Sequence, residues 1–83
     1  MNGFERQDTL DKVVDIVSKK LSVDKDVVIK SKSFQDLGAD SLDMVEIIMK
    51  LEEQFGIEIN DEDAEKLESL DQVIDYIHGM RKR

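Results

Sequence analysis

The fold is decided by Asp36-Leu37-Gly38-Ala39-Asp40-Ser41-Leu42-Asp43, a loop that leads into a helix. Gly38 tolerates backbone angles that other residues avoid, so the chain can turn sharply there. Asp40 is a favourable N-cap, because its carboxylate can accept a backbone N–H from the first helical turn. The Ser41 hydroxyl then stands at the positive end of the helix dipole, where unpaired N–H groups suit a phosphate attached to it. The Asp-Ser pair alone could equally be two adjacent caps.

A longer string of residues resembles the acyl carrier proteins of fatty acid synthesis. The octapeptide is followed by Val45-Glu46 and by Leu51-Glu52-Glu53-Gln54-Phe55, and the resemblance runs from about Val13 to Ile77. It implies that Ser41 carries 4′-phosphopantetheine through a phosphodiester, that a separate transferase adds this arm from coenzyme A, and that the thiol of the arm holds acyl groups as thioesters. Asn60 stands where the family very often has proline, which removes a rigid helix start.

Length and composition predict one small domain spanning residues 1–83. The chain has no cysteine, which excludes disulfides, thiolate catalysis and cysteine-based zinc sites and fits a reducing compartment. No apolar run approaches the length of a membrane span, and the N-terminus lacks the apolar core of a secretory signal. We therefore expect a cytoplasmic protein, or one of an organelle matrix if a transit peptide has been removed.

Negative charge is concentrated in one part of the chain. Residues 36–68 hold 12 acidic residues and two lysines, a net charge of −10, whereas the remaining residues carry +2. Such a block repels nucleic acids and anionic membranes, so we expect neither as a partner. It should attract basic patches on other proteins. The plainer interpretation is a surface that keeps the protein soluble.

Hydrophobic spacing predicts an all-α fold, a small four-helix bundle with three longer helices and a short third one. An apolar stripe over residues 10–21 indicates the first helix, which could start at Asn2 or Asp8. A long connection follows over residues 22–40, with a helical turn over 24–28. We expect it to be ordered because several of its apolar residues can reach the core: Val27, Val28, Ile29, Phe34 and Leu37.

The later helices are indicated by their end signals. The second should run from Ser41 to Phe55 and end at Gly56. Asn60 is a favourable cap for the short third helix, and Ser69 with Gln72 fits a capping box for the fourth. Residues 1–8 are interpreted as an N-terminal extension that can fray, and residues 79–83 as a basic C-terminal tail.

The second helix has apolar residues on two sides. At 100° per residue, an arc of about 100° should face the core, and the resemblance makes its residues candidates for an acyl pocket: Met44, Ile47, Ile48, Leu51 and Phe55. A second arc of about 60° is left over on nearly the opposite side. With nearby carboxylates it predicts a docking face, or else partial burial beside a loop. The predicted docking residues are Asp36, Asp40, Leu42, Asp43, Val45, Glu46, Met49, Glu52 and Glu53.

No catalytic set can be assembled from this sequence, so we do not expect an enzyme. Ser41 would need a base to act as a nucleophile, and the only histidine, His78, lies on another helix near the C-terminus. A calcium loop would need glycine at its sixth position, where the stretch from Asn60 has Glu65. We therefore predict no specific metal site, and weak nonspecific divalent binding near Asp36, Asp40 and Asp43 stays open.

Three functions remain compatible with the sequence. The first is a carrier of fatty acyl chains, with a phosphopantetheinyl transferase (holo-carrier synthase), ketoacyl synthases, malonyl transferase, reductases, dehydratase and acyltransferases as partners that dock through basic patches. The second is a carrier for polyketide, aminoacyl or lipid A-type acyl groups. The third is an acidic helical adaptor that carries no thiol. We expect a monomer without membrane insertion in each case.

Overall fold

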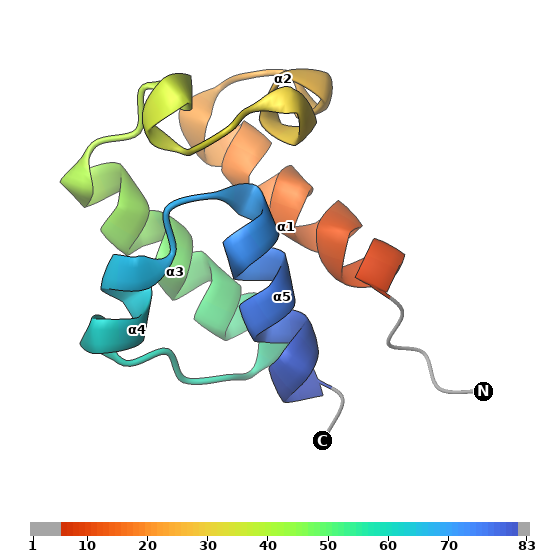
Figure 1. Cartoon of the computed structure of the whole chain (residues 1–83), viewed down its shortest axis with the longest axis vertical. Helices are drawn as coiled ribbons and strands as arrows, with labels where there is room; N and C mark the ends of the chain where they lie inside the picture. Colours follow the sequence, from red (N-terminus) through yellow and green to blue (C-terminus); the bar gives the residue numbers. More distant parts are fainter. Residues whose placement is uncertain (1–5, 82–83) are drawn as a thin grey trace.

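The protein is a small bundle of helices in the computed structural model, which describes residues 6–81 (Figure 1). The elements in chain order are α1 (Arg6–Leu21), α2 (Lys25–Lys30), the 3₁₀ helix η1 (Gln35–Leu37), α3 (Ser41–Phe55), α4 (Asp61–Lys66) and α5 (Leu70–Arg81). Residues 6–81 contain no strand, and the predicted all-α class is confirmed. The three longer helices are α1, α3 and α5, and α4 is the predicted short one.

The terminal helices include residues that the sequence assigned to an N-terminal extension and to a C-terminal tail. Helix α1 begins at Arg6, between the two predicted starts, and so includes residues 6–8 of the expected extension. Helix α5 runs through Gly79 to Arg81. The remaining residues of the extension and of the basic tail lie outside the described residues.

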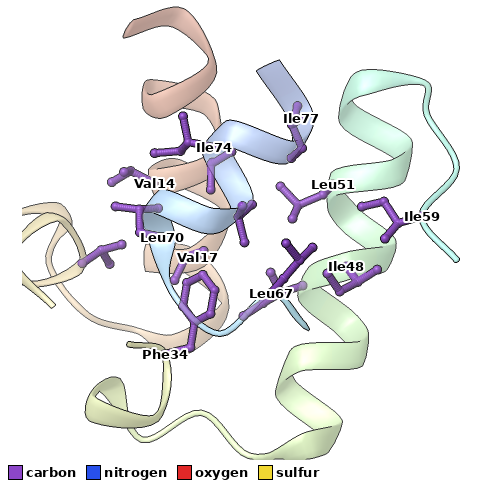
Figure 2. Packing of buried hydrophobic residues seen from close by; sticks show 14 residues of the cluster. Val14, Val17, Phe34, Ile48, Leu51, Ile59, Leu67, Leu70, Ile74 and Ile77 are labelled. Atoms are coloured by element: carbon purple, nitrogen blue, oxygen red, sulfur yellow. The ribbon is translucent and has the colours of Figure 1, made fainter. Parts of the chain in front are cut away.

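The core is built mainly from the apolar stripes of α1, α3 and α5 (Figure 2). Its fully buried residues include Val13 and Val17 from α1, Ile47 and Leu51 from α3, and Val73, Ile74 and Ile77 from α5. Burying one such side chain contributes about 1.5–3 kcal/mol relative to leaving it exposed. Among residues 6–81, no helix combines the length and the apolar character that crossing a membrane requires.

The connection between α1 and α3 is anchored by three of the five predicted residues, because Leu37 is partly buried and packs against the core together with Val28 and Phe34. Val28 of α2 is fully buried, and Phe34 is 2% exposed, with its ring directed into the core cluster (Figure 2). Val27 and Ile29 are about half exposed, so the prediction that they pin the connection was wrong. Successive residues of a helix point about 100° apart, so three consecutive residues spread over about 200° and cannot all face the core. In α2 the middle residue of the trio, Val28, faces it.

Hydrogen bonds around Phe34 hold the loop that precedes Ser41. The Phe34 N–H donates to the Glu68 carbonyl over 2.9 Å, and the Ala39 N–H donates to the Phe34 carbonyl over 3.2 Å. The first bond joins this loop to the segment between α4 and α5. The start of α3 is thereby fixed against the rest of the bundle.

Helix α4 is held by polar contacts on two sides. The Asn60 side chain accepts a hydrogen bond from the Asp63 N–H, so the predicted cap is confirmed. The Tyr76 hydroxyl of α5 donates to Asp63 Oδ2 over 2.8 Å. The Ile59 N–H donates to Glu52 Oε2 of α3 over 2.9 Å. These bonds and the buried Ile59 position α4 beside α3.

Candidate attachment site and docking face

Ser41 is the first residue of α3 and is exposed. The loop reaches it through Gly38, whose φ of 83° lies in the left-handed region that glycine tolerates best. Asp40 Oδ1 then accepts from the Asp43 N–H over 2.8 Å, and Asp43 Oδ2 accepts from the Asp40 N–H over 3.3 Å. Asp40 therefore caps α3 as predicted, whereas the reciprocal bond from the Asp40 N–H to the Asp43 carboxylate was not predicted from the sequence. The Ser41 hydroxyl is left without a capping role.

The electrostatic surroundings of Ser41 combine opposite signs. The N-terminus of α3 is the positive end of its dipole, whereas Asp40 and Asp43 bring negative charge. A cation from α1 lies nearby, because Lys20 Nζ forms an ion pair with Glu46 Oε1. The hydrogen bond to Glu46 raises the pKa of Lys20, and the charges of Asp43 and Asp40 act in the same direction.

The apolar part of the predicted docking face is exposed. Leu42 is 66% exposed, Val45 54% and Met49 56%, so burial beside a loop does not account for these residues. The carboxylates around them differ in their exposure to solvent. Asp36, Asp40 and Glu53 are exposed, whereas Asp43, Glu46 and Glu52 are partly buried.

A groove of ≈ 1060 Å³ runs between α3 and α4 and begins beside Ser41. From the predicted acyl pocket, Met44 and Ile48 line it, whereas Ile47, Leu51 and Phe55 do not. The other lining residues were not predicted as pocket residues: Ser33, Phe34, Gln35, Ala39, Asp40, Ser41, Val45, Met49, Glu52, Ile59, Asp61, Ala64, Glu65, Leu67 and Glu68.

The groove follows a stripe of α3 that lies between the two predicted arcs. Ser41, Val45, Ile48 and Glu52 succeed one another at spacings of four, three and four residues, so they share one side of the helix. This spacing could have indicated, from the sequence alone, which residues of α3 form one wall of the groove. The opposite wall comes from α4 and residues 65–68, whose position depends on tertiary packing. Ile47 and Leu51, both fully buried, belong to the core behind the groove.

Groups that could support catalysis or bind a metal are not gathered at Ser41. His78 Nδ1 lies 3.4 Å from Thr9 Oγ1 at the interface of α1 and α5. Within residues 6–81, no three histidine or acidic side chains are arranged to hold a metal ion. What the site offers is an exposed hydroxyl at a helix N-terminus, beside a groove and an acidic helix.

Comparison with known proteins identifies the class of protein to which this fold and site belong. The family model described as phosphopantetheine attachment site matches residues 11–77, which marks the chain as a carrier domain. Acyl carrier proteins from Campylobacter lari and Thermosynechococcus vestitus are both 53% identical to it, over 87% and 92% of this chain and 95% of each relative. The crystal structure of an acyl carrier protein from Thermotoga maritima superposes with a TM-score of 0.75 at 31% identity, covering 93% of this chain and 91% of that one.

A second solved structure, the acyl carrier protein from Enterococcus faecalis, has a TM-score of 0.70 at 40% identity over 89% of this chain and 95% of that one. The chain therefore belongs to the acyl carrier protein family. It is a carrier and not an enzyme, and its cofactor is 4′-phosphopantetheine.

Proposed function

We propose that the Ser41 hydroxyl carries the phosphopantetheine arm and that the protein presents fatty acyl thioesters to the enzymes of fatty acid synthesis. In the loading step, Ser41 Oγ attacks the phosphorus next to pantetheine in coenzyme A. The new Oγ–P bond forms as the pyrophosphate bond breaks, adenosine 3′,5′-bisphosphate leaves, and the hydroxyl proton passes to a base on the transferase. The observation that carries the proposal is the exposed Ser41 at the start of α3, with Asp40 supplying the cap.

The local structure acts on a phosphodiester at this atom in two opposing ways. Free N–H groups of the first turn and the helix dipole attract it, whereas Asp40 and Asp43 repel it. Each effect is on the order of 1 kcal/mol or less at an exposed site. The arm would leave from beside the groove, since Ser41 and Met44 both line it.

The docking face supports the proposed partners. Leu42, Val45 and Met49 supply apolar contact area, and the surrounding carboxylates attract basic residues. A face that begins one residue after Ser41 brings a docked enzyme next to the arm. We propose that the phosphopantetheinyl transferase, ketoacyl synthases, malonyl transferase, reductases, dehydratase and acyltransferases use it in turn, and that the carrier acts as a monomer in the cytoplasm.

We also propose that the groove shelters the acyl chain. Met44, Ile48 and Ala64 give it apolar walls, and Ile59 and Leu67 line its inner side. A ligand that binds only the folded state stabilises it, so the melting temperature should rise as the acyl chain lengthens. Ala64→Leu, which narrows the groove, should reduce this rise, whereas Leu42→Ala, outside the groove, should leave it intact. Melting temperatures that do not depend on chain length would contradict the shelter.

The experiment for the main proposal is incubation with coenzyme A and a phosphopantetheinyl transferase, followed by intact mass measurement. The unchanged protein should gain one arm, and Ser41→Ala should gain none. No gain would favour the acidic adaptor, and a gain in Ser41→Ala would move the attachment to another residue. A fatty acid ketoacyl synthase that condenses an acyl primer with the malonyl group loaded on this protein, with release of CO2, then separates the fatty acid pathway from other carrier pathways.

A further inference from the structure

Lys20 reaches from the last turn of α1 to a carboxylate of the docking face. Its ammonium pairs with Glu46 of α3, and the lysine side chain is only 29% exposed, against 45% for that of Glu46. Among the predicted docking carboxylates, Glu46 is the one that forms an ion pair within residues 6–81. One of the charges expected to attract partners is thus already neutralised from within the molecule.

The neighbouring lysine has a different arrangement. Lys19 pairs with Asp15 one turn earlier in α1, and its side chain is 77% exposed. Removing either lysine changes the net charge of the protein by the same amount. Only Lys20, however, forms an ion pair with a residue of α3. Comparing the two substitutions therefore separates the effect of the Lys20–Glu46 pair from the effect of the net charge.

We propose that Lys20 is a partner-selecting residue, an internal counter-cation that occupies Glu46 until a basic side chain of a docking enzyme displaces it. The proposal depends on the proposed function, because it assumes that partners use α3. Partners whose basic residue must bind Glu46 compete with Lys20 for it. Partners that bind Asp40 or Glu53 instead do not, since neither carboxylate forms an ion pair in the described part of the chain.

The charge pattern around Lys20 sets the direction of the effect. Its position near Glu46, Asp43 and Asp40 lowers the negative potential on the flank of α3 that faces α1. Replacing it with a neutral side chain frees Glu46 and removes a charge that repels a basic partner. The change expected from one partly exposed ion pair is about two- to fivefold in apparent affinity at low salt. It should shrink at about 1 M ionic strength, where the Debye length is only ~3 Å.

The test is the kcat/KM of phosphopantetheine transfer, with coenzyme A and a transferase that has a basic docking surface, for Lys20→Gln, Lys19→Gln, Glu46→Gln and the double variant Lys20→Gln/Glu46→Gln. We expect Lys20→Gln to raise kcat/KM about two- to fivefold at low salt. Lys19→Gln should change it less. In the Glu46→Gln background, Lys20→Gln should raise kcat/KM clearly less, because only the loss of a repelling charge near Asp43 and Asp40 remains. A purely structural role of Lys20 would not produce this dependence on Glu46.

Three results would overturn the proposal: equal effects of Lys19→Gln and Lys20→Gln, a lower kcat/KM for Lys20→Gln, or the full effect of Lys20→Gln without Glu46. Lys20→Arg, which keeps the pair, should behave like the unchanged protein and guards against a folding artefact. Failure of the unchanged protein to accept the arm would overturn the proposed function itself, and the Lys20 proposal with it.

Discussion

Tyr76 shows how one residue supports the groove from a distance. Its hydroxyl donates to Asp63 of α4, and its ring lies partly buried at the edge of the core. Burial raises the pKa of Tyr76, and the hydrogen bond to Asp63 adds to this increase. The residue therefore connects the stability of the bundle to the position of the helix that forms one wall of the groove.

Stability at alkaline pH should depend on Tyr76. Because its pKa is higher in the folded state, its contribution is complete below the unfolded value of about 10 and is lost as the pH rises through the folded value. Tyr76→Phe should lower the free energy of unfolding at neutral pH by about 1 kcal/mol and make the alkaline decline shallower. Urea unfolding between neutral pH and pH of about 11 measures both effects.

Lys20 should account for a further part of the loss of stability at alkaline pH. Its pKa is also raised, so it too loses stabilising charge at alkaline pH, and part of the decline should persist in Tyr76→Phe. The double variant Tyr76→Phe/Lys20→Gln should flatten the curve further. An unchanged pH dependence in Tyr76→Phe would show that the Tyr76–Asp63 contact does not couple α5 to α4.

At the scale of elements, the end signals of the helices were the most predictable feature. Helix α3 begins at Ser41 and ends before Gly56 as predicted, because both ends depend on local chemistry. The predicted Ser69–Gln72 capping box is also present, with Gln72 Oε1 accepting from the Ser69 N–H over 3.0 Å and Ser69 Oγ accepting from the Gln72 N–H over 3.3 Å. Short motifs of this kind need no knowledge of the distant chain.

Features that depend on packing between elements were not predictable. The sequence could not indicate that α4 and residues 65–68 form the second wall of the groove, or that Lys20 pairs with Glu46. It also could not tell which of Val27, Val28 and Ile29 faces the core, because three consecutive apolar residues have no period.

The cap of α3 should be measurable by substitution. Asp40→Ala removes the side chain that accepts from the Asp43 N–H, and we expect a loss of about 1 kcal/mol in the free energy of unfolding. Asp36→Ala is the matched control, since it removes the same charge from an exposed residue whose side chain caps no α-helix. Equal stability of the two variants in urea unfolding would contradict the capping role.

Two glycines should respond to alanine with opposite signs. Gly56 ends α3 with a φ of 63°, which alanine adopts at a cost of about 1–2 kcal/mol. Gly79 lies inside α5, where alanine is favoured over glycine by roughly 0.5–1 kcal/mol. Neither added methyl group would meet an atom within 4 Å, so backbone preference alone decides both results. Chemical denaturation should find Gly56→Ala less stable and Gly79→Ala more stable than the unchanged protein.

For the whole molecule, uneven charge is the dominant electrostatic feature. Residues 36–68 carry a net charge of −10, and they include α3 and α4, the two helices beside the groove. Mutual repulsion in this region destabilises the compact state, while the same field attracts basic partners. Stability and partner recognition therefore place opposite demands on these carboxylates.

Salt should therefore stabilise the protein. Raising the ionic strength from about 0.01 M to about 1 M shortens the Debye length from ~30 Å to ~3 Å and screens the repulsion among residues 36–68. We expect the melting temperature, followed by circular dichroism, to rise by several degrees. Glu53→Gln, which removes one exposed charge of the block, should gain less from salt. A melting temperature that falls with salt would mean that ion pairs such as Lys20–Glu46 outweigh the repulsion.

The central claim concerns a single oxygen atom, and peptide-level mass spectrometry of the protein isolated from its own cells tests it most directly. After proteolysis, the peptide that contains Ser41 should carry the mass of one phosphopantetheine arm or of its acyl thioester, and fragmentation should assign that mass to Ser41. A native protein in which this peptide is always unmodified, or in which the arm lies on another residue, would contradict the account.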